Sequence, residues 1–505
     1  MKPFSSRLSW LLALALLVFG LGLRLYDLTD QPLDFHPTRQ LRGAIIARGI
    51  YYQMLSPAET EASRAVAFWR SFEEFEPPIL ETLVAGVYVL AGGEHLWIAR
   101  IFSSIFWIVG GLVLYLLARR SVGADGALVG LAYYLILPFA VYASRSFQPD
   151  PAMTMWIVLT AGALYRWAEL TSQPSSSRAA QQWKWAVLAG ILGSLAILTK
   201  VVAVFIVGGA AMALVIHALG LKRLWRNPQV WVMAVLMIAP TAIYYLTRQE
   251  RASQYVSSWT LSLSYLLLQP AFYVRWLSFL QSLMGFTALV LALTGVLIAP
   301  ALLRTLLLGL WGGYVAYGLF LPYQMYTHNY YHIQLVPVIS LSLVPLAHLI
   351  VRQLTQQPRF WRMAFALVAL AAIAFPAWTV RSELISRDFR DEPAYWQAIV
   401  ANLPADGKII ALTKDYGYRL MYYGWRQVAI WPISGERELA QLRGSAKEFE
   451  TFFAKRIEGK SYFLIAPPRL LDDQPDLKQA LEQGYPLIAQ SSDFLLFDLA
   501  HPSKR

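Results

Sequence analysis

Eleven apolar segments, each long enough or nearly long enough to cross a lipid bilayer, constrain this chain of 505 residues more than any other feature. A helix that crosses about 30 Å of hydrocarbon needs roughly 20 mainly apolar residues. The first segment ends without a small-residue cleavage site, so we interpret it as a span and not as a signal peptide. The segments cover residues 8–23, 96–118, 124–143, 153–167, 185–198, 201–219, 230–246, 283–298, 306–321, 333–351 and 363–380.

The composition excludes a water-soluble protein. Hydrophobic residues make up 57% of the chain and charged residues only 15%, whereas a soluble domain carries about 25% charged residues. The chain has no cysteine, which excludes disulfides, cysteine nucleophiles and thiolate metal sites. We therefore predict a mainly α-helical membrane protein, a polytopic bundle of about eleven transmembrane helices.

Lysine and arginine residues predict the orientation, because cytoplasmic loops are enriched in them. With the N-terminus inside and eleven spans, four basic clusters fall inside. Counting the short apolar stretch 79–91 as a span would move all four outside, so we interpret it as an interfacial or re-entrant helix. We attribute the net charge of +12 mainly to basic cytoplasmic loops. Binding of an anionic ligand is the second explanation. The clusters are Arg119/Arg120, Arg178/Lys184, Lys222/Arg223/Arg226 and Arg352/Arg359/Arg362.

This orientation predicts a multi-pass protein of the cell (inner) membrane with a cytoplasmic N-terminus. Residues 25–95 form one long extracytoplasmic loop with juxtamembrane helices, and the tail from about 381 is also outside. We predict two domains, a transmembrane module at 1–380 and a small extracytoplasmic α/β domain at 381–505. In the tail, strand patterns at 408–412, 427–431, 461–465, 486–489 and 494–497 alternate with helical patterns at 436–455 and 476–482.

The polar residues point to a site at the outer membrane face. A transporter is expected to keep ionisable groups near mid-membrane, but here the apolar segments are nearly free of them. In the first outer loop, Asp34 and His36 precede a helical pattern that contains Arg39. Either Asp34 or His36 has the chemistry of a general base or a metal ligand. The alternative is that Asp34 and His36 shape a turn and the arginines contact lipid headgroups.

Four further outer segments carry candidate residues, each with a structural alternative. Glu76, in Glu73-Glu74-Phe75-Glu76-Pro77-Pro78, is able to bind a metal or a cation, or to favour a helix start. Arg145 and Asp150 lie between two spans, and Asp150-Pro151 is also a typical helix start. Lys200 needs either an anion, such as a phosphate, or the interface. His328, Tyr330 and His332 lie in an aromatic loop that suits a phosphate, a sugar or an interfacial belt.

The order of these segments resembles that of the polytopic GT-C glycosyltransferases of the family-39 type, which include protein O-mannosyltransferases and lipid A aminoarabinose transferases. The resemblance covers roughly residues 8–350 and rests on several short motifs in sequence. They are the acidic first loop, Glu76-Pro77-Pro78, the span from Ala99-Arg100 to Arg119-Arg120, Ser144-Arg145 with Pro149-Asp150, Leu198-Thr199-Lys200, and His332 with Pro337.

The resemblance implies transfer of a sugar from a polyprenyl-phosphate donor to an extracytoplasmic acceptor, and we predict direct displacement with inversion. It implies that an acid of the first loop acts as base or positions the acceptor. It also carries over Arg39, Glu76, Asp150 and Lys200 as phosphate or acceptor-site groups. The family often has Asp-Glu two residues before the arginine, where this chain has His36-Pro37. We therefore predict Asp34 as the base, with His36 as the alternative.

We predict the catalytic residues Asp34, His36, Glu76 and Asp150. We predict substrate contacts by Arg39, Arg145, Lys200, His328, Tyr330 and His332. Partners are a polyprenyl-phosphate-linked sugar, membrane lipid and an acceptor that the sequence does not identify, with no nucleic acid. Whether a divalent metal takes part stays open, although Asp34, Glu76 and Asp150 are of the type that binds one. The alternatives are a lipid-linked sugar transporter or flippase, a non-catalytic scaffold, and an oligosaccharyl ligase of the same fold.

Overall fold

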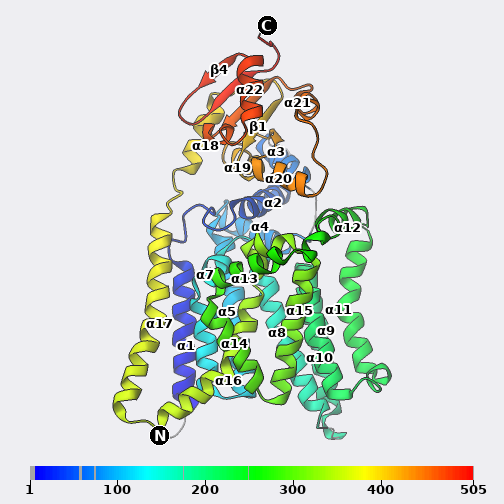
Figure 1. Cartoon of the computed structure of the whole chain (residues 1–505), viewed down its shortest axis with the longest axis vertical. Helices are drawn as coiled ribbons and strands as arrows, with labels where there is room; N and C mark the ends of the chain where they lie inside the picture. Colours follow the sequence, from blue (N-terminus) through cyan, green and yellow to red (C-terminus); the bar gives the residue numbers. More distant parts are fainter. Residues whose placement is uncertain (1–5, 56–59, 73–75, 174–175, 248, 504–505) are drawn as a thin grey trace. The chain divides into compact units, whose positions relative to one another are not determined.

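A computed structural model describes residues 6–55, 60–72, 76–173, 176–247 and 249–503, and helices make up most of it (Figure 1). The chain forms two compact units. The first comprises Met1–Leu28, Glu74–Leu80 and Trp97–Arg387. The second comprises Thr29–Glu73, Glu81–Leu96 and Asp388–Arg505. The domain boundary expected at 380/381 stays a prediction.

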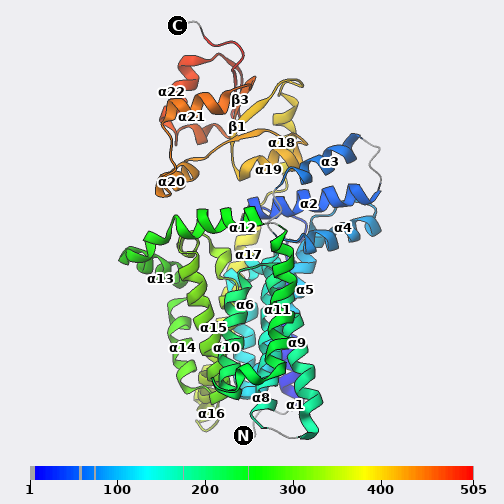
Figure 2. The same cartoon turned by 90° about the vertical axis from the view of Figure 1, so that its right-hand side faces the viewer.

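The first unit is a bundle of long helices that run side by side (Figures 1 and 2). Each of the eleven predicted apolar segments overlaps a helix of this bundle. The described α-helices of the first unit, including α12 and α13, which lie across the end of the bundle (Figure 2), are α1 (Ser6–Leu25), α5 (Trp97–Ser121), α6 (Ala124–Ile136), α7 (Pro138–Arg145), α8 (Asp150–Thr171), α9 (Ala179–Thr199), α10 (Ala203–Leu219), α11 (Pro228–Leu246), α12 (Gln249–Val256), α13 (Pro270–Met284), α14 (Phe286–Ile298), α15 (Ala301–Phe320), α16 (Leu335–Thr355) and α17 (Arg359–Ser386).

Seven described helices are long and apolar enough to cross a membrane, and two bent pairs raise the number to nine. The pair α6 and α7 bends by 60° where Pro138 begins the second helix, and the pair α13 and α14 bends by 96° around Gly285. The two other predicted segments are α8 and the shorter α10, which pack among the spans. The chain is therefore a multi-pass membrane protein with a helical fold, as predicted.

The basic residues gather at the end of the bundle where α1 begins, which we call the basic end. Arg119 of α5 lies over the ring of Trp10 near the start of α1, 4.9 Å from its centroid. Arg120 pairs with Glu169 near the end of α8 at 2.9 Å. His217 near the end of α10 contacts Thr305 near the start of α15 at 2.9 Å. The helices that meet in these contacts therefore alternate in direction, and the predicted cytoplasmic side of the basic end stays a prediction.

Helices α10 and α15 pack backbone against backbone through glycines. A Cβ added to Gly309 would lie 2.5 Å from the carbonyl oxygen of Gly209, and one added to Gly313 would lie 2.3 Å from that of Phe205. Small residues four apart on one helix allow this close approach. Nothing lies within 4 Å of such an atom at Gly312, on another side of the same helix.

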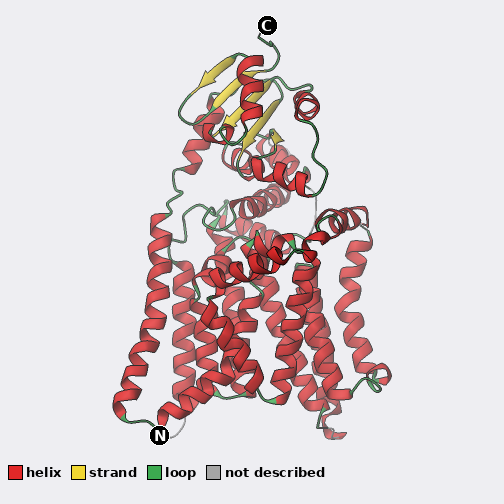
Figure 3. Ribbon diagram, in the orientation of Figure 1, coloured by secondary structure: helices red, strands yellow, loops and turns green. Residues whose placement is uncertain are grey.

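The second unit contains a five-stranded sheet in the order β2-β1-β3-β5-β4 (Figure 3). The strands β2, β1 and β3 are parallel, and β5 and β4 are antiparallel to their neighbours. Buried Ile410, Leu412, Trp431, Phe463 and Phe497 form part of its core. The strands are β1 (Ile409–Thr413), β2 (Ala429–Trp431), β3 (Tyr462–Ala466), β4 (Leu487–Gln490) and β5 (Leu495–Asp498), each close to a predicted strand.

The helical pattern predicted at 436–455 is two helices, because Gly444, with φ +66°, ends the first. The stretch 79–91 is a helix with those bounds, and its first two residues belong to the first unit. The helices are α2 (Pro37–Leu55), α3 (Thr60–Arg70), α4 (Ile79–Ala91), α18 (Glu392–Ala401), α19 (Tyr418–Tyr423), α20 (Ser434–Leu442), α21 (Phe449–Ile457) and α22 (Pro475–Gly484).

Candidate active site

A buried ion pair joins two predicted site residues at the end of the bundle opposite the basic end. The Nζ atom of Lys200, which directly follows α9, lies 2.8 Å from Oδ1 of Asp150, the first residue of α8. The side chains are 5% and 3% exposed. The start of a helix favours a carboxylate, since its free N–H groups carry partial positive charge. Thus Asp150 begins a helix, as expected, and also neutralises Lys200.

Aromatic rings cover this pair. The ammonium of Lys200 lies 4.9 Å from the ring centroid of Tyr330 and 5.0 Å from that of Tyr331. Tyr331 stacks on Tyr317 of α15, with centroids 6.1 Å apart. Rings hold a cation by their negative faces and keep water away from it. We call Asp150, Lys200, Tyr317, Tyr330 and Tyr331 the Lys200 cluster.

The Lys200 cluster contains hydrogen-bonding atoms that its own residues do not use. Oδ2 of Asp150 and the hydroxyl of Tyr317 are buried and make no hydrogen bond within the described chain. A buried polar atom without a partner costs about 1–3 kcal/mol. Such atoms at one place indicate a site prepared for a polar ligand, which also gives a reason for a buried lysine there.

His332 has a packing role in this structure, and its predicted contact with substrate stays a prediction. It is fully buried, and its Nε2 lies 3.0 Å from the carbonyl oxygen of Met325, which only accepts. Nε2 therefore carries the proton, and Nδ1 accepts from the hydroxyl of Tyr314 at 2.6 Å. That hydroxyl in turn accepts from Trp276 at 3.1 Å. Both ring nitrogens are used to fix the loop that carries Tyr330.

His328 is half-buried and packs by its ring edge against the same tyrosines. The ring centroids of Tyr330 and Tyr331 lie 5.7 and 5.9 Å from that of His328. Its Nδ1 lies 2.7 Å from the hydroxyl oxygen of Thr327. His328 therefore borders the Lys200 cluster, and its contact with substrate stays a prediction.

Arg145 belongs to a group of buried arginines at the same end of the first unit. It donates to the carbonyl oxygen of Asp27 at 2.9 Å, and Arg100 donates to that of Leu28 at 2.9 Å. Arg24 donates to the hydroxyl of Ser144 at 2.6 Å. These bonds tie the end of α1 to α5 and α7. Sequence reasoning missed the role of Arg24, although an arginine ending an apolar run is a signal for such a bond.

Glu76 lies half-buried in the segment before α4. Glu73, Glu74 and Phe75 of the same motif lie outside the described residues. The expected role of Glu76 in acceptor or metal binding stays a prediction.

In the second unit, Asp34 and His36 form the turn that starts α2. Asp34 is 9% exposed, and its Oδ1 accepts from Nε2 of Gln40 at 3.2 Å. The same Nε2 donates to the carbonyl oxygen of Phe35 at 2.7 Å. The carbonyl oxygen of His36 accepts from the backbone N–H groups of Arg39 and Gln40. The turn therefore holds the Asp34 carboxylate in a fixed position, and the catalytic roles of Asp34, His36 and Arg39 stay predictions.

Arg48 forms a buried ionic contact in the second unit, which the sequence did not predict. Its guanidinium lies over the rings of Tyr422 and Trp425, 3.7 and 4.3 Å from their centroids. It pairs with Glu94 at 2.8 Å and donates to the carbonyl oxygen of Tyr422 at 2.7 Å. Burial alone would lower the pKa of Arg48, but Tyr422 and Glu94 raise it above its ordinary value. We call this contact the Arg48 lock.

A second ionic contact binds the start of α2 to the C-terminal segment. Thr38 donates to Oδ1 of Asp415 at 2.8 Å, and Arg419 donates to Oδ2 of Asp415 at 2.6 Å. Arg419 also pairs with Glu392 at 2.7 Å. Burial opposes the charge of Arg419, but Asp415 and Glu392 raise its pKa above the ordinary value. The first loop and the tail are thus held together by charged side chains.

Within the described residues, no three His, Asp or Glu side chains gather as ligands for a metal ion. At the Lys200 cluster, the ammonium already neutralises one oxygen of Asp150. The residues there suit an anionic or hydroxylic ligand better than a second cation.

The bundle and the small mixed sheet have the fold of the GT-C glycosyltransferases, as the sequence resemblance implied. The chain is similar to the crystal structure of ArnT from Cupriavidus metallidurans bound to undecaprenyl phosphate, with 16% identity, 98% of each chain covered and a TM-score of 0.56. It is also similar to the apo oligosaccharyltransferase from Archaeoglobus fulgidus, with 12% identity, 94% and 73% covered and a TM-score of 0.57.

A third similar structure is that of the arabinofuranosyltransferase AftD from Mycobacteria, with 16% identity and a TM-score of 0.54. It covers 99% of this chain and 40% of AftD. Residues 76–246 match the family model of the dolichyl-phosphate-mannose-protein mannosyltransferases. This segment includes Arg145, Asp150 and Lys200. No curated protein sequence matches the chain.

Proposed function

We propose that this protein is an integral-membrane glycosyltransferase that transfers a sugar from a polyprenyl-phosphate donor to an extracytoplasmic acceptor. The observation that carries the proposal is the Lys200 cluster in a GT-C bundle. The similar ArnT structure binds undecaprenyl phosphate, which supports this class of donor. The N-terminus and the basic end would face the cytoplasm, and the Lys200 cluster would face the other side of the cell membrane.

In this proposal Lys200 binds the donor phosphate. An ammonium has three N–H donors, and Asp150 accepts only one of them at 2.8 Å. When the acceptor oxygen bonds to the anomeric carbon, the bond from that carbon to the phosphate oxygen breaks, and the phosphate gains negative charge. A cation held in place before the reaction stabilises this charge without having to reorganise. Arg39 is proposed as a further phosphate contact.

The acceptor hydroxyl loses its proton in the same step, and we propose Asp34 as the group that takes it. Attack from the face opposite the phosphate inverts the anomeric carbon. Asp34→Asn is a clean test, because an amide oxygen still accepts from Gln40 and the turn is retained. We expect sugar transfer to fall by roughly 100- to 10,000-fold. Full activity in this variant would contradict the role of Asp34.

His36→Asn tests the alternative base. His36 has φ +48°, and asparagine adopts this left-handed backbone region more readily than most residues. We expect this variant to keep its activity. If His36→Asn loses transfer and Asp34→Asn does not, the base is His36.

The measurement is loss of radiolabelled sugar from a polyprenyl-phosphate donor by the purified full chain, with extracts as acceptor. Lys200→Ala should bind the donor more weakly and transfer less. A preference for a diphosphate-linked oligosaccharide would instead identify an oligosaccharyl ligase. Donor binding without transfer in every extract would identify a carrier, and no donor binding would refute the proposal.

A further inference from the structure

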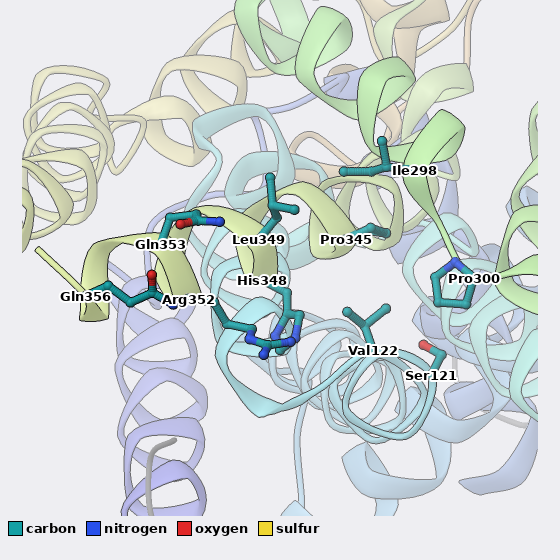
Figure 4. A pocket seen from close by; sticks show the side chains of 10 residues that line it. All are labelled: Ser121, Val122, Ile298, Pro300, Pro345, His348, Leu349, Arg352, Gln353 and Gln356. Atoms are coloured by element: carbon teal, nitrogen blue, oxygen red, sulfur yellow. The ribbon is translucent and has the colours of Figure 1, made fainter. Parts of the chain in front are cut away.

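A pocket of about 530 Å³ lies at the basic end of the first unit, opposite the Lys200 cluster (Figure 4). The ends of α5, α14 and α16 and the start of α15 surround it. Its volume falls within the range of about 300–1,000 Å³ that is usual for ligand sites. The proposed transferase function does not use it.

One face of α16 supplies most of its polar groups. His348, Arg352 and Gln356 follow at intervals of four residues, and Leu349 and Gln353 lie beside them. Residues four apart lie on one side of a helix. In Figure 4 the side chains of His348 and Arg352 extend from α16 close to each other. The helix therefore presents an imidazole, a guanidinium and amides together.

The opposite wall stays close to α16 because it contains glycines. A Cβ at Gly123 would lie 2.9 Å from Cε1 of His348, and φ of +153° at this residue disfavours any side chain. A Cβ at Gly126 would lie 2.3 Å from the carbonyl oxygen of Val344. Ser121 and Val122 then border the pocket directly. The pocket is thus a built feature and not a gap left by loose packing.

The polar groups that line the pocket are positive or neutral. Nδ1 of His348 is buried without a hydrogen bond in the described part of the chain. The described residues give Arg352 no ion pair, and none of the ten lining residues is acidic. An unpaired guanidinium favours an anion with several oxygens, which accept from its planar fork.

The remaining wall is apolar and open. Ile298 and Leu349 are 46% and 51% exposed, and both line the pocket at the ends of spans. A phosphate alone would leave this wall unused, whereas a phospholipid also covers it with an acyl chain. Basic pockets between spans on the cytoplasmic side bind anionic headgroups. We infer that this pocket binds one anionic phospholipid, with its phosphate at Arg352 and His348 and a chain along Ile298 and Leu349.

Native mass spectrometry of the delipidated full chain tests the inference. Dioleoyl phosphatidylglycerol is titrated against dioleoyl phosphatidylcholine, and the fraction of protein with one bound lipid is measured. We expect one phosphatidylglycerol to bind at least about tenfold more tightly, since each charge-assisted hydrogen bond contributes on that scale. Arg352→Gln should remove this preference. Arg359→Gln, which removes a charge at the same end but outside the pocket, should keep it.

Gln353→Glu is a second variant in case Arg352→Gln does not fold, because it keeps the side-chain size at an exposed position. It should repel the headgroup and also remove the preference. Lys200→Ala should keep it, which separates this pocket from the proposed donor site. Equal binding of both lipids, equal loss in Arg359→Gln, or displacement of the lipid by an equal concentration of glycerol phosphate would each overturn the inference.

Discussion

At the residue scale, the central feature of the Lys200 cluster is that the carboxylate of Asp150 neutralises the buried ammonium of Lys200. Asp150 and Lys200 are both almost fully buried, so neither charge reaches bulk water. Removing one partner of such a pair typically costs about 3–5 kcal/mol, because the other charge stays buried alone. Replacing both by apolar residues is often neutral. This asymmetry allows a structural role of the pair to be separated from a functional one.

We predict that Lys200→Met lowers the thermal unfolding midpoint of the detergent-purified protein by several degrees. The double variant Asp150→Leu/Lys200→Met should recover most of that loss but still lack sugar transfer. Scanning fluorimetry measures the first quantity and the labelled-donor assay the second. Transfer at the normal rate by the double variant would show that the pair serves the fold alone.

The sequence identified Lys200 and Asp150 as candidates but not as partners. They lie 50 residues apart, and each had an ordinary alternative as an interfacial lysine or a helix start. Only the antiparallel packing of α8 and α9 brings the two helix ends together. The packing role of His332 was not evident from the sequence. A histidine in an aromatic loop looks accessible in sequence, and its partners Tyr314 and Met325 become evident only in three dimensions.

At the element scale, hydrophobic period and turn residues predicted most helices and all five strands. The bends were missed, because an apolar run continues through them. The run at 124–143 contains the bend at Pro138, and the run at 283–298 contains Gly285, where φ of +83° separates α13 from α14. An apolar sequence indicates that a segment contacts lipid or the protein core. It does not indicate where the helix axis changes direction.

The contact between α10 and α15 gives a prediction with a matched control. Gly313→Ala should lower the thermal unfolding midpoint, because its Cβ would meet the carbonyl oxygen of Phe205 at 2.3 Å and force the helices apart. Overpacking of this kind costs about 1–3 kcal/mol. Gly312→Ala, one residue earlier and in open space, should leave the midpoint unchanged or raise it. Equal effects of the two substitutions would show that the close approach does not matter for stability.

At the scale of the whole molecule, the second unit is assembled from three separate stretches of chain. The Arg48 lock joins all three, through Arg48, Glu94 and Tyr422. Sequence analysis placed the first loop with the spans, because it lies between them in the chain. The first loop contacts the C-terminal tail through individual side chains that are far apart in the sequence. Hydrophobic periodicity does not predict contacts of this kind.

We predict that Arg48→Met makes the first loop more sensitive to limited proteolysis and lowers the unfolding midpoint. The substitution keeps the length of the side chain but leaves Glu94, which is 16% exposed, without its cation. Arg48→Met/Glu94→Gln should restore part of the resistance. Arg64→Met, at an exposed position of α3, should behave like the unmodified protein, and similar cleavage of the Arg48→Met and Arg64→Met variants would contradict the lock.

The Arg48 lock can form only late in biosynthesis, because its residues are far apart in the sequence. Tyr422 is made 328 residues after Glu94, and at about 5–20 residues per second a ribosome needs roughly 15–65 s to add them. During that interval the helices from α5 to α17 are synthesised, and the first loop still lacks the segment that completes it. Arg48 and Glu94 must therefore stay soluble and unpaired from Tyr422 until the last span is in place. A nascent chain stalled before residue 422 would lack a partner of Arg48, so the second unit is completed only after the spans have been made.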